Sequence, residues 1–326
     1  MSSRTAAADV LGIGQNATDT LIELPRFPAF NSELEFLSAR VLAGGQVATA
    51  VIACQQWGLR TRYIGKVGDD PAGELQRREL DRAGVESHLI VVPDCLSQSS
   101  FILIDQATGE RTILYNRDAR LGLKPEDLRR DWVNSARLVH VDGHNAVAGT
   151  VAARWAREAG AVVTADLDHV YPGIDELLAV LDYAVTSRSF PEHWAGEPDL
   201  FQAMKKVHER YKNRMICTTL GRDGALAWDG SRFWYAPAYR VATVDTTGAG
   251  DVFHGAFAYG VLQSWPTDRL LEFCCAAAGL NCTVLGARGG IKSLEEIERL
   301  REEGERYPKL FHVKHLQMHC KTGSKS

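Results

Sequence analysis

The chain has 326 residues, of which 45% are hydrophobic and 24% are charged, and its formal net charge is −4. This length suits one large α/β domain or two modest ones, and the mild negative charge argues against a general nucleic-acid binder. No apolar run reaches the roughly 18 residues that a membrane span needs, so no membrane partner is expected.

The N-terminal residues 1–8 lack the apolar segment of a secretion signal and predict a loose arm. The seven cysteines are scattered, no Cys-x-x-Cys pair occurs, and most of them lie within apolar runs. This pattern favours reduced thiols in a cytoplasmic protein over disulfides or a zinc site.

The first predicted strand, Asp9–Ile13, is closed by Gly14, and Asp19 follows five residues later. An aspartate in such a loop is commonly a turn residue, although its carboxylate can also accept two hydroxyl donors at once. Strand-like alternation continues over Leu21–Leu42, but prolines and polar residues interrupt it. This second stretch does not predict a core element.

The segment Ala43–Thr49 opens a predicted helix that runs to Trp57 and stops at Gly58. Two further strands, at 99–104 and 111–115, are joined by a turn-rich hairpin connection, and Arg117 lies just beyond them. Arg117 either binds an anionic group on a ligand or is a solvated surface charge.

Later strands end in polar residues. His144 follows the strand at 138–141, and Asp166 and Asp168 lie at the end of the predicted strand at 162–168. Carboxylates just past a parallel strand point toward the ligand crevice, and Mg²⁺ prefers such ligands. His144 either hydrogen-bonds a substrate or caps a loop. A glycine-marked turn, Gly221–Gly224, follows the strand that ends at Thr219.

The most informative stretch is Val244–Phe253. Residues 241–244 predict the end of a strand, 246–250 a turn of small residues, and Asp251 onward a mostly buried helix. Backbone N–H groups and the positive end of the helix dipole converge at such a turn and form an anion site. Asp251 is either a helix N-cap or a base that accepts a proton from an attacking hydroxyl.

An apolar helix at 270–283, a glycine-rich loop at 285–290 and a charged helix at 293–306 complete the pattern, and 307–326 predicts a mobile tail. The alternation of strands and helices across residues 9–302 predicts an α/β domain. Its expected architecture is a doubly wound, mostly parallel sheet flanked by helices.

Asp245-Thr-Thr-Gly-Ala-Gly-Asp251-x-Phe-x-Gly resembles the C-terminal signature of the ribokinase-like (PfkB) family of small-molecule kinases. Ala43–Thr49 resembles the N-terminal signature of that family, except that Thr49 stands where most members carry Asn. Several stretches look closest to ketohexokinase or fructokinase members. The resemblance implies a kinase domain over 9–302 with a small β-sheet lid, built from segments at about 15–42 and 97–117.

The resemblance also implies roles for individual residues. Asp251 would be the catalytic base, and the anion hole would consist of Gly248, Ala249 and Gly250. The sugar would be bound by a set at the lid and the first helix, namely Asp19, Gly44, Gly45, Gln46 and Thr49, with His144 and Arg117 as further candidates. The nucleotide would be bound by residues of two turns, Thr219, Gly221, Gly224, Thr247, Gly248 and Gly250.

Asp166 and Asp168 are the Mg²⁺ candidates, and Asp245 is the candidate for a monovalent cation such as K⁺. The family's Asn-x-x-Glu motif is replaced by Ser187-Arg188-Ser189-Phe190, so its role cannot be transferred to this chain. A homodimer through the lid is expected, with Phe27, Phe30 and Phe36 facing the second copy.

The predicted function is therefore ATP-dependent phosphorylation of a primary hydroxyl of a sugar, with a ketohexose such as fructose ranked first. The alternatives are an anionic hexose derivative, a nucleoside, or a catalytically silent sugar-binding regulator. The intact Asp251 and the Gly-Ala-Gly turn argue against the last of these.

Overall fold

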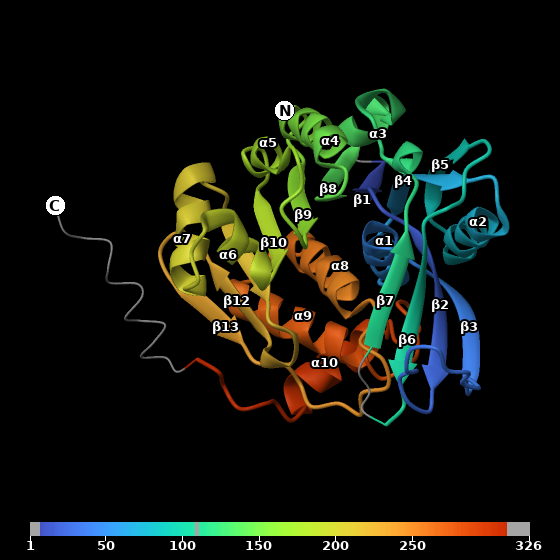
Figure 1. The fold of residues 1–326 in the computed structure, drawn as a ribbon. Coiled ribbons are helices and arrows are strands. Elements are labelled where there is room, and N and C mark those ends of the chain that lie inside the picture. The colour runs from blue at the N-terminus through green and yellow to red at the C-terminus, as the bar shows by residue number, and fades with distance from the viewer. Residues whose placement is uncertain (1–6, 108–110, 312–326) are drawn as a thin grey trace.

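A large twisted sheet forms the centre of the protein in the computed structural model, which describes residues 7–107 and 111–311 (Figure 1). Within these residues the sheet has nine strands. In spatial order they are β13 (Phe233–Ala236), β12 (Ala225–Trp228), β11 (Met215–Thr219), β10 (Tyr183–Ser187), β9 (Val162–Leu167), β8 (Ala136–Asp142), β1 (Ala8–Ile13), β4 (Thr61–Gly68) and β5 (Glu86–Val92).

All neighbours from β11 to β5 pair in parallel, whereas β12 and β13 pair antiparallel at one edge. The chain order reverses at β1, because β4 lies on one side of it and β8 on the other. In open parallel sheets, ligands bind in the crevice beyond the carboxyl ends of the strands at such a reversal. The fold therefore places a crevice beside the ends of β1 and β8.

Helices cover both faces of the sheet, and each layer buries its own apolar cluster. One layer comprises α1 (Gln46–Gln56), α2 (Pro71–Ala83), α8 (Ala249–Leu262), α9 (Thr267–Asn281) and α10 (Leu294–Glu303). The other comprises α3 (Arg130–Asn134), α4 (Ala146–Glu158), α5 (Ile174–Leu178), α6 (Ser189–Ala195) and α7 (Leu200–Tyr211). This is the doubly wound α/β architecture that the sequence predicts.

Helices α1 and α8 pack closely against each other in the interior. A Cβ atom on Gly255 of α8 would lie 2.7 Å from the carbonyl oxygen of Ala50 on α1. The Sγ atom of Cys54 lies 3.3 Å from the carbonyl oxygen of Gly255. Both helices are mainly apolar around their whole circumference, as expected for buried helices. This packing fixes their N-terminal ends relative to each other.

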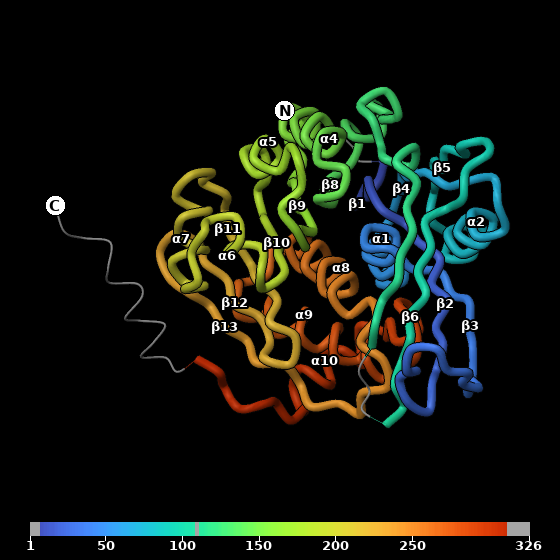
Figure 2. The backbone as a smooth tube through the Cα atoms, viewed as in Figure 1, coloured from blue at the N-terminus to red at the C-terminus, as the bar shows by residue number. Residues whose placement is uncertain are grey.

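A second, four-stranded sheet stands beside the large one, in the order β3 (Ser38–Gly44), β2 (Ala17–Leu24), β6 (Ser99–Asp105) and β7 (Arg111–Asn116). The chain leaves β1, enters β2 after three residues, and returns through β3 directly into α1 (Figure 2). We call this sheet the lid. Its two segments lie close to the predicted limits of 15–42 and 97–117.

The two faces of the lid differ. Asp19, Ser100 and Ile102 are buried on the face that we call inner. Successive side chains in a strand point to opposite faces, so the strand register places Phe101 and its partner Leu114 on the outer face, where both are about half exposed. Three phenylalanines of the β2–β3 connection are also exposed, namely Phe27, Phe30 and Phe36.

The predicted tail begins with residues that pack on the domain. The amide of Tyr307 donates to the carbonyl of Ala238 over 2.9 Å, and the Phe311 ring contacts Tyr235. Residues 1–6 of the predicted arm and 312–326 of the tail lie outside the described residues. In the part of the chain that is described, no helix combines the length and apolar character needed to cross a bilayer.

Candidate active site

Helix α8 starts at a glycine turn and points its N-terminus into the crevice. Its N-cap is Gly248, with φ 73°, and no side chain caps the helix. A side chain on Gly248 would collide with the carbonyl oxygen of Ala287, so both the backbone angle and the space require glycine. The amide of Ala249 donates to the Thr246 carbonyl, whereas the amides of Gly250 and Asp251 bond to no described residue. Free amides at a helix N-terminus attract an anion.

Asp251 lies in the first turn of α8 and is not its N-cap, so the capping interpretation is wrong. The helix begins two residues earlier than predicted, because the positive φ of Gly248 ends the turn there. Burial, together with the negative charge of Asp166, raises the pKa of Asp251 to about 7. A carboxyl group with such a pKa is suited to exchange protons near neutral pH.

Two buried polar residues hold the turn in place. Both carboxylate oxygens of Asp245 accept hydrogen bonds, from the amide and hydroxyl of Thr247 at 2.9 and 2.7 Å and from the amide of Gly286 at 2.8 Å. The side-chain amide of Asn281 donates to the carbonyls of Thr247 and Ala287, each over 3.1 Å. These hydrogen bonds join the turn and the 286–290 loop into one unit. Both carboxylate oxygens of Asp245, the candidate for a monovalent cation, are used in them.

The strand predicted at Val241–Val244 is wrong. This segment pairs with no strand among the described residues, and the amides of Val244 and Asp245 both donate to the Cys282 carbonyl at the end of α9. A run of β-branched residues alone does not make a strand, because the backbone groups of a strand also need a neighbouring strand.

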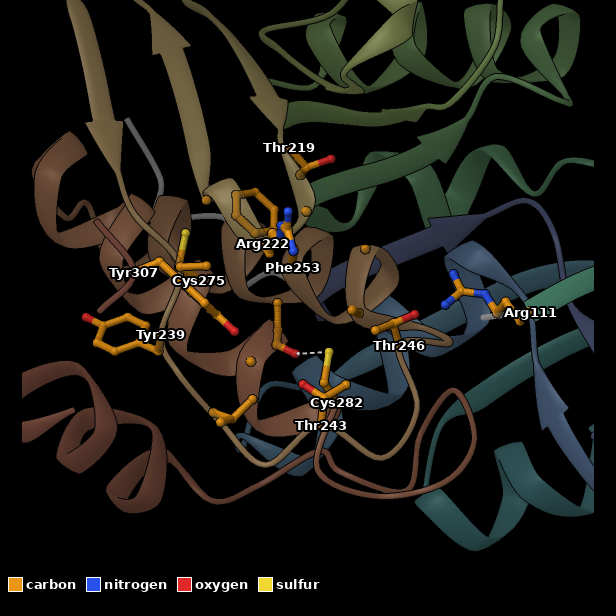
Figure 3. Close-up of a pocket in the computed structure, with 18 residues that line it drawn as sticks. Arg111, Thr219, Arg222, Tyr239, Thr243, Thr246, Phe253, Cys275, Cys282 and Tyr307 are labelled. Atoms are coloured by element: carbon orange, nitrogen blue, oxygen red, sulfur yellow. Dashed lines mark hydrogen bonds between the residues drawn. The ribbon is translucent and has the colours of Figure 1, made fainter. Parts of the chain in front are cut away.

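A cavity of about 390 Å³ lies against the start of α8 (Figure 3). Its lining brings Thr219, Gly221 and Gly224 of the predicted nucleotide turn together with Gly250 of the α8 turn. Arg111 reaches its rim from lid strand β7. Of the residues predicted to bind nucleotide, Thr247 and Gly248 do not line this cavity, since they face Asp245 and the 286–290 loop. The cavity walls are mainly apolar, which suits a flat base above a phosphate site.

The lid and α1 form the other side of the site. Asp19 is buried on β2 and accepts a hydrogen bond from the hydroxyl of Ser100 on β6. Burial raises the pKa of the Asp19 carboxyl. A side chain on Gly44 would collide with this carboxylate. Gly45 is the N-cap of α1 with φ 95°, and Gln46 is the first residue of the helix.

Thr49, where the sequence departs from the family pattern, has a specific partner. Its hydroxyl accepts a hydrogen bond from Nε of Arg288 over 3.1 Å, and Nη2 of Arg288 donates to the Gly44 carbonyl over 2.6 Å. The Oε1 atom of Gln46 is buried and has no hydrogen-bond partner among the described residues. The predicted sugar residues Asp19, Gly44, Gly45, Gln46 and Thr49 therefore lie around one short stretch of lid and helix.

The remaining polar candidates fall into two groups. His144 forms a hydrogen bond of 2.9 Å with the hydroxyl of Tyr171 and lies 3.6 Å from Asp168. Burial acts to raise the pKa of Asp168, but His144 and His169 hold it at about 2. Asp168 is therefore a firmly ionised member of a polar cluster at the end of β9.

Asp166 belongs to a different, buried group. Its carboxylate lies 3.1 Å from Nε2 of His254, which is carried by α8 one turn away from the start of that helix. Within the described residues, no three His, Cys, Asp or Glu side chains are grouped as a metal site. The two Mg²⁺ candidates, Asp166 and Asp168, thus belong to separate polar groups, and each carboxylate is paired with histidine.

Arg117 is partly buried and reaches toward the end of β8. Its Nη2 donates to Oδ1 of Asn145 over 3.3 Å, at a narrow recess that is also lined by Gly14 and Asn16. Asn145 in turn donates to the buried carboxylate of Asp142. Arg117 therefore faces the crevice at the reversal of the sheet and is not a freely solvated surface charge.

The stretch that replaces the Asn-x-x-Glu motif lies at the end of β10. The Ser187 hydroxyl donates to the carbonyl of Asp168, Arg188 is exposed, and Phe190 is fully buried in the core. Phe190 occupies the position of the motif's Glu, so a packing residue stands there in place of a carboxylate.

Sequence reasoning missed three residues of the site: Asn281, His254 and Arg288. Two of them had a detectable signal, because Asn281 and His254 are polar residues inside otherwise apolar helices. Arg288 stands out in the sequence only as a charge within a glycine-rich loop. Its partners Thr49 and Gly44 lie 239 and 244 positions away, so no local pattern reveals them.

Comparison with known proteins agrees with this geometry. Residues 18–294 match the pfkB family carbohydrate kinase model. The chain is similar to an ATP-dependent ribose-1-phosphate kinase of Halopiger xanaduensis, with 29% identity over 86% of this chain and 93% of the relative. It is also similar to a fructokinase of Klebsiella pneumoniae, with 27% identity over 78% of this chain and 91% of the relative.

Among solved structures, a putative ribokinase from Agrobacterium tumefaciens superimposes with a TM-score of 0.84 and 27% identity, covering 91% of this chain and 98% of that chain. The fold is thus ribokinase-like, with the large sheet and the separate small sheet that this family shares. The family match spans well over half of the chain. The protein belongs to the pfkB family of carbohydrate kinases and is a kinase enzyme.

Proposed function

We propose that this enzyme transfers the γ-phosphoryl group of Mg·ATP to a primary hydroxyl of a small sugar, with Asp251 as the base. One observation carries the proposal. A carboxyl group with a pKa of about 7 stands in the first turn of a helix whose Gly250 and Asp251 amides are free, between the large cavity and the lid residue Asp19. A proton acceptor and an anion-binding turn are what such a transfer requires.

Each side of the site has its own task in this proposal. The cavity lined by Thr219, Gly221 and Gly224 receives the nucleotide, which supplies the phosphoryl group. The α8 amides stabilise the negative charge that develops on that group. Asp19, Gly44 and Gln46 orient the sugar so that its hydroxyl faces Asp251. Mg²⁺ would offset the negative charge of the phosphates, and it would need few protein ligands, for which Asp166 and Asp168 are the candidates.

The identity of the sugar is the finer part of the proposal. The sequence ranks a ketohexose such as fructose first, and a relative named fructokinase supports including it. A relative named ribose-1-phosphate kinase supports an anionic acceptor as the second candidate, and Arg288 is the specific observation in its favour. A nucleoside is the third candidate acceptor.

The outer face of the lid, with Phe101 and Leu114 half exposed, is proposed to contact a second copy of the chain.

The test measures ADP release from Mg·ATP with fructose, ribose, ribose 1-phosphate and adenosine, for the natural enzyme and for Asp251→Asn. We expect acceptor-dependent ADP release that falls at least about 10²-fold in the variant, the usual contribution of a general base. Asn retains the size of the side chain, so ATP binding measured by calorimetry should persist. If turnover survives in Asp251→Asn, Asp251 is not the catalytic base.

Repeating the assay with and without K⁺ tests Asp245 as the candidate for a monovalent-cation ligand.

A further inference from the structure

The guanidinium group of Arg288 is fixed at the sugar side of the site but is only partly used there. Nε and Nη2 are bonded to the Thr49 hydroxyl and the Gly44 carbonyl, over 3.1 and 2.6 Å. Nη1 is buried from solvent and has no hydrogen-bond partner among the described residues. A buried donor without a partner is costly, so its presence in a binding crevice indicates a group supplied by a ligand.

Arg288 also lacks a counter-ion among the described residues, where it forms no ion pair within 4 Å. Its electrostatic neighbours include the carboxylates of Glu79, Asp251 and Asp19, but none of them lies within ion-pair distance of the guanidinium group. Burial lowers the pKa of Arg288 to about 10, so the side chain remains a cation at neutral pH. A buried cation is normally paired, because the loss of hydration is otherwise not offset.

A second arginine approaches the same region from the lid. Arg117, just beyond β7, borders the recess lined by Gly14 and Asn16. The hydroxyl of Tyr63 donates to the Gly14 carbonyl over 2.7 Å and accepts from the side chain of Asn16 over 3.1 Å. Tyr63 is an electrostatic neighbour of both Arg288 and Arg117. Arg288 of the 286–290 loop and Arg117 beside the lid are therefore two cations on the sugar side of the crevice, and a third, Lys66, which lines the same recess, is paired with Asp127.

We propose that Arg288, assisted by Arg117, binds a phosphate ester on the acceptor, so that a sugar monophosphate with a free primary hydroxyl takes first place over the neutral ketohexose that the sequence ranks first. The proposal rests on the kinase function proposed above and names the substrate class of the same site. Phosphate is favoured over carboxylate because it has three terminal oxygens and can be approached by two guanidinium groups from different sides. The unpaired Gln46 oxygen is free to accept from a sugar hydroxyl beside it.

The first test compares matched acceptors in the natural enzyme: ribose against ribose 1-phosphate, and fructose against fructose 1-phosphate. Each pair shares a free primary hydroxyl and differs in the phosphate. Charge-assisted hydrogen bonds predict a kcat/KM that is roughly 10- to 100-fold higher for the phosphorylated member. Gluconate, which carries a carboxylate and keeps a free primary hydroxyl, serves as the carboxylate-bearing probe, and a preference for it over both phosphates would overturn the choice of phosphate.

The second test removes the cation. Arg288→Gln should lower kcat/KM for the phosphorylated sugar about 10-fold or more beyond its effect on the neutral sugar, so that the preference collapses. Arg154→Gln, on an exposed site of α4, is the matched control and should leave the preference intact. Calorimetry of ribose 1-phosphate with the Asp251→Asn protein, with and without Arg288→Gln, reports binding without turnover. Arg117→Gln replaces Arg288→Gln if thermal melting shows that the latter does not fold.

Two failures are distinguishable. One failure is that neutral sugars and their phosphate esters have equal kcat/KM, or that Arg288→Gln lowers kcat/KM equally for both members of a pair. In that case Arg288 only supports the loop. This inference is then wrong, while the kinase function stands. If the folded natural enzyme phosphorylates no acceptor of either kind and binds none in calorimetry, the proposed function itself fails, and the inference falls with it.

Discussion

Helices α1 and α8 both begin at a glycine with positive φ and border different halves of the candidate site. Each starts after a glycine with positive φ, 95° at Gly45 and 73° at Gly248, and neither is capped by a side chain. The first turn of α8 carries a carboxyl group, Asp251, whereas the first turn of α1 has no acidic residue. The two glycine turns differ in geometry, with ψ 137° at Gly45 and 0° at Gly248, and the side chains beside each turn assign the proposed sugar and phosphoryl roles.

The loop that contains Ala287 and Arg288 lies between the two turns. A Cβ atom on Gly248 would collide with the Ala287 carbonyl, and one on Gly44 would lie 3.5 Å from the Ala287 side chain. Asn281 bonds this loop and the α8 turn at once. We therefore expect a displacement at one helix start to move the other through the loop.

The largest expected effect comes from placing a side chain at each helix start. Gly248→Ala should lower kcat by about 10²-fold or more, because the charge-stabilising amides of α8 move. Gly45→Ala should act mainly on the KM for the sugar, because a side chain there meets the backbone of Asn16 and Ala17 beside the lid. Steady-state kinetics with each substrate varied separates the two. An equal loss of kcat in both variants would contradict the division of roles.

The pH dependence of kcat/KM also distinguishes the two helix starts. Of the two helices, only α8 carries a carboxyl group in its first turn. The pKa of Asp251 is raised to about 7, so the group is protonated and unable to act as a base below that pH. We expect log(kcat/KM) for the sugar to fall with a slope of about one as pH decreases below 7. A rate that stays constant down to pH 5 would show that Asp251 is not the group that titrates in catalysis.

Asn281→Ala tests the connection between the two turns. The change removes two donated hydrogen bonds and one accepted from the Gly290 amide, and should lower the free energy of unfolding by about 1–3 kcal/mol. Asn213→Ala is the matched control, since this buried asparagine also donates to two carbonyls but lies away from the site. Urea unfolding should show similar losses for both variants. Only Asn281→Ala should also lower kcat and raise the sugar KM.

The smallest effect is expected on the outer face of the lid. Leu114→Lys places a charge in the proposed contact with a second copy and should weaken self-association about 10-fold or more, as measured by analytical ultracentrifugation. Because lid strand β3 leads directly into α1, the sugar KM should change more than the ATP KM. A protein that is monomeric before the substitution would rule out the proposed contact.

The parts of the site that sequence reasoning could predict are those encoded by neighbouring residues. The Gly-Ala-Gly turn and the helix behind it follow from local backbone preferences, and the fold follows from alternating strands and helices. Asp251 as a cap was a wrong interpretation because the sequence does not reveal that φ turns positive at Gly248. The strand predicted at Val241–Val244 is wrong because no strand lies beside it within the described residues, and the amides of Val244 and Asp245 donate to the end of α9 instead.

Contacts between distant segments could not be predicted. The pairing of Arg288 with Thr49 joins residues 239 positions apart, and the burial of Asp19 depends on Ser100 in a strand that arrives 81 positions later. Such contacts depend on how the sheets are placed relative to each other. A single sequence specifies that placement only through the complete fold.

The position of Asp19 along its strand has a mechanical consequence. Strand β2 begins at Ala17, three residues after the end of β1, and extends to Leu24. At roughly 3.3 Å per residue, Asp19 lies about 7 Å from the start of the strand, whereas Leu24 lies about 23 Å away. If the lid pivots near its junction with β1, the carboxylate travels about a third as far as the tip. The far end of the lid can therefore swing through a wide arc to admit a ligand while Asp19 stays close to its working position.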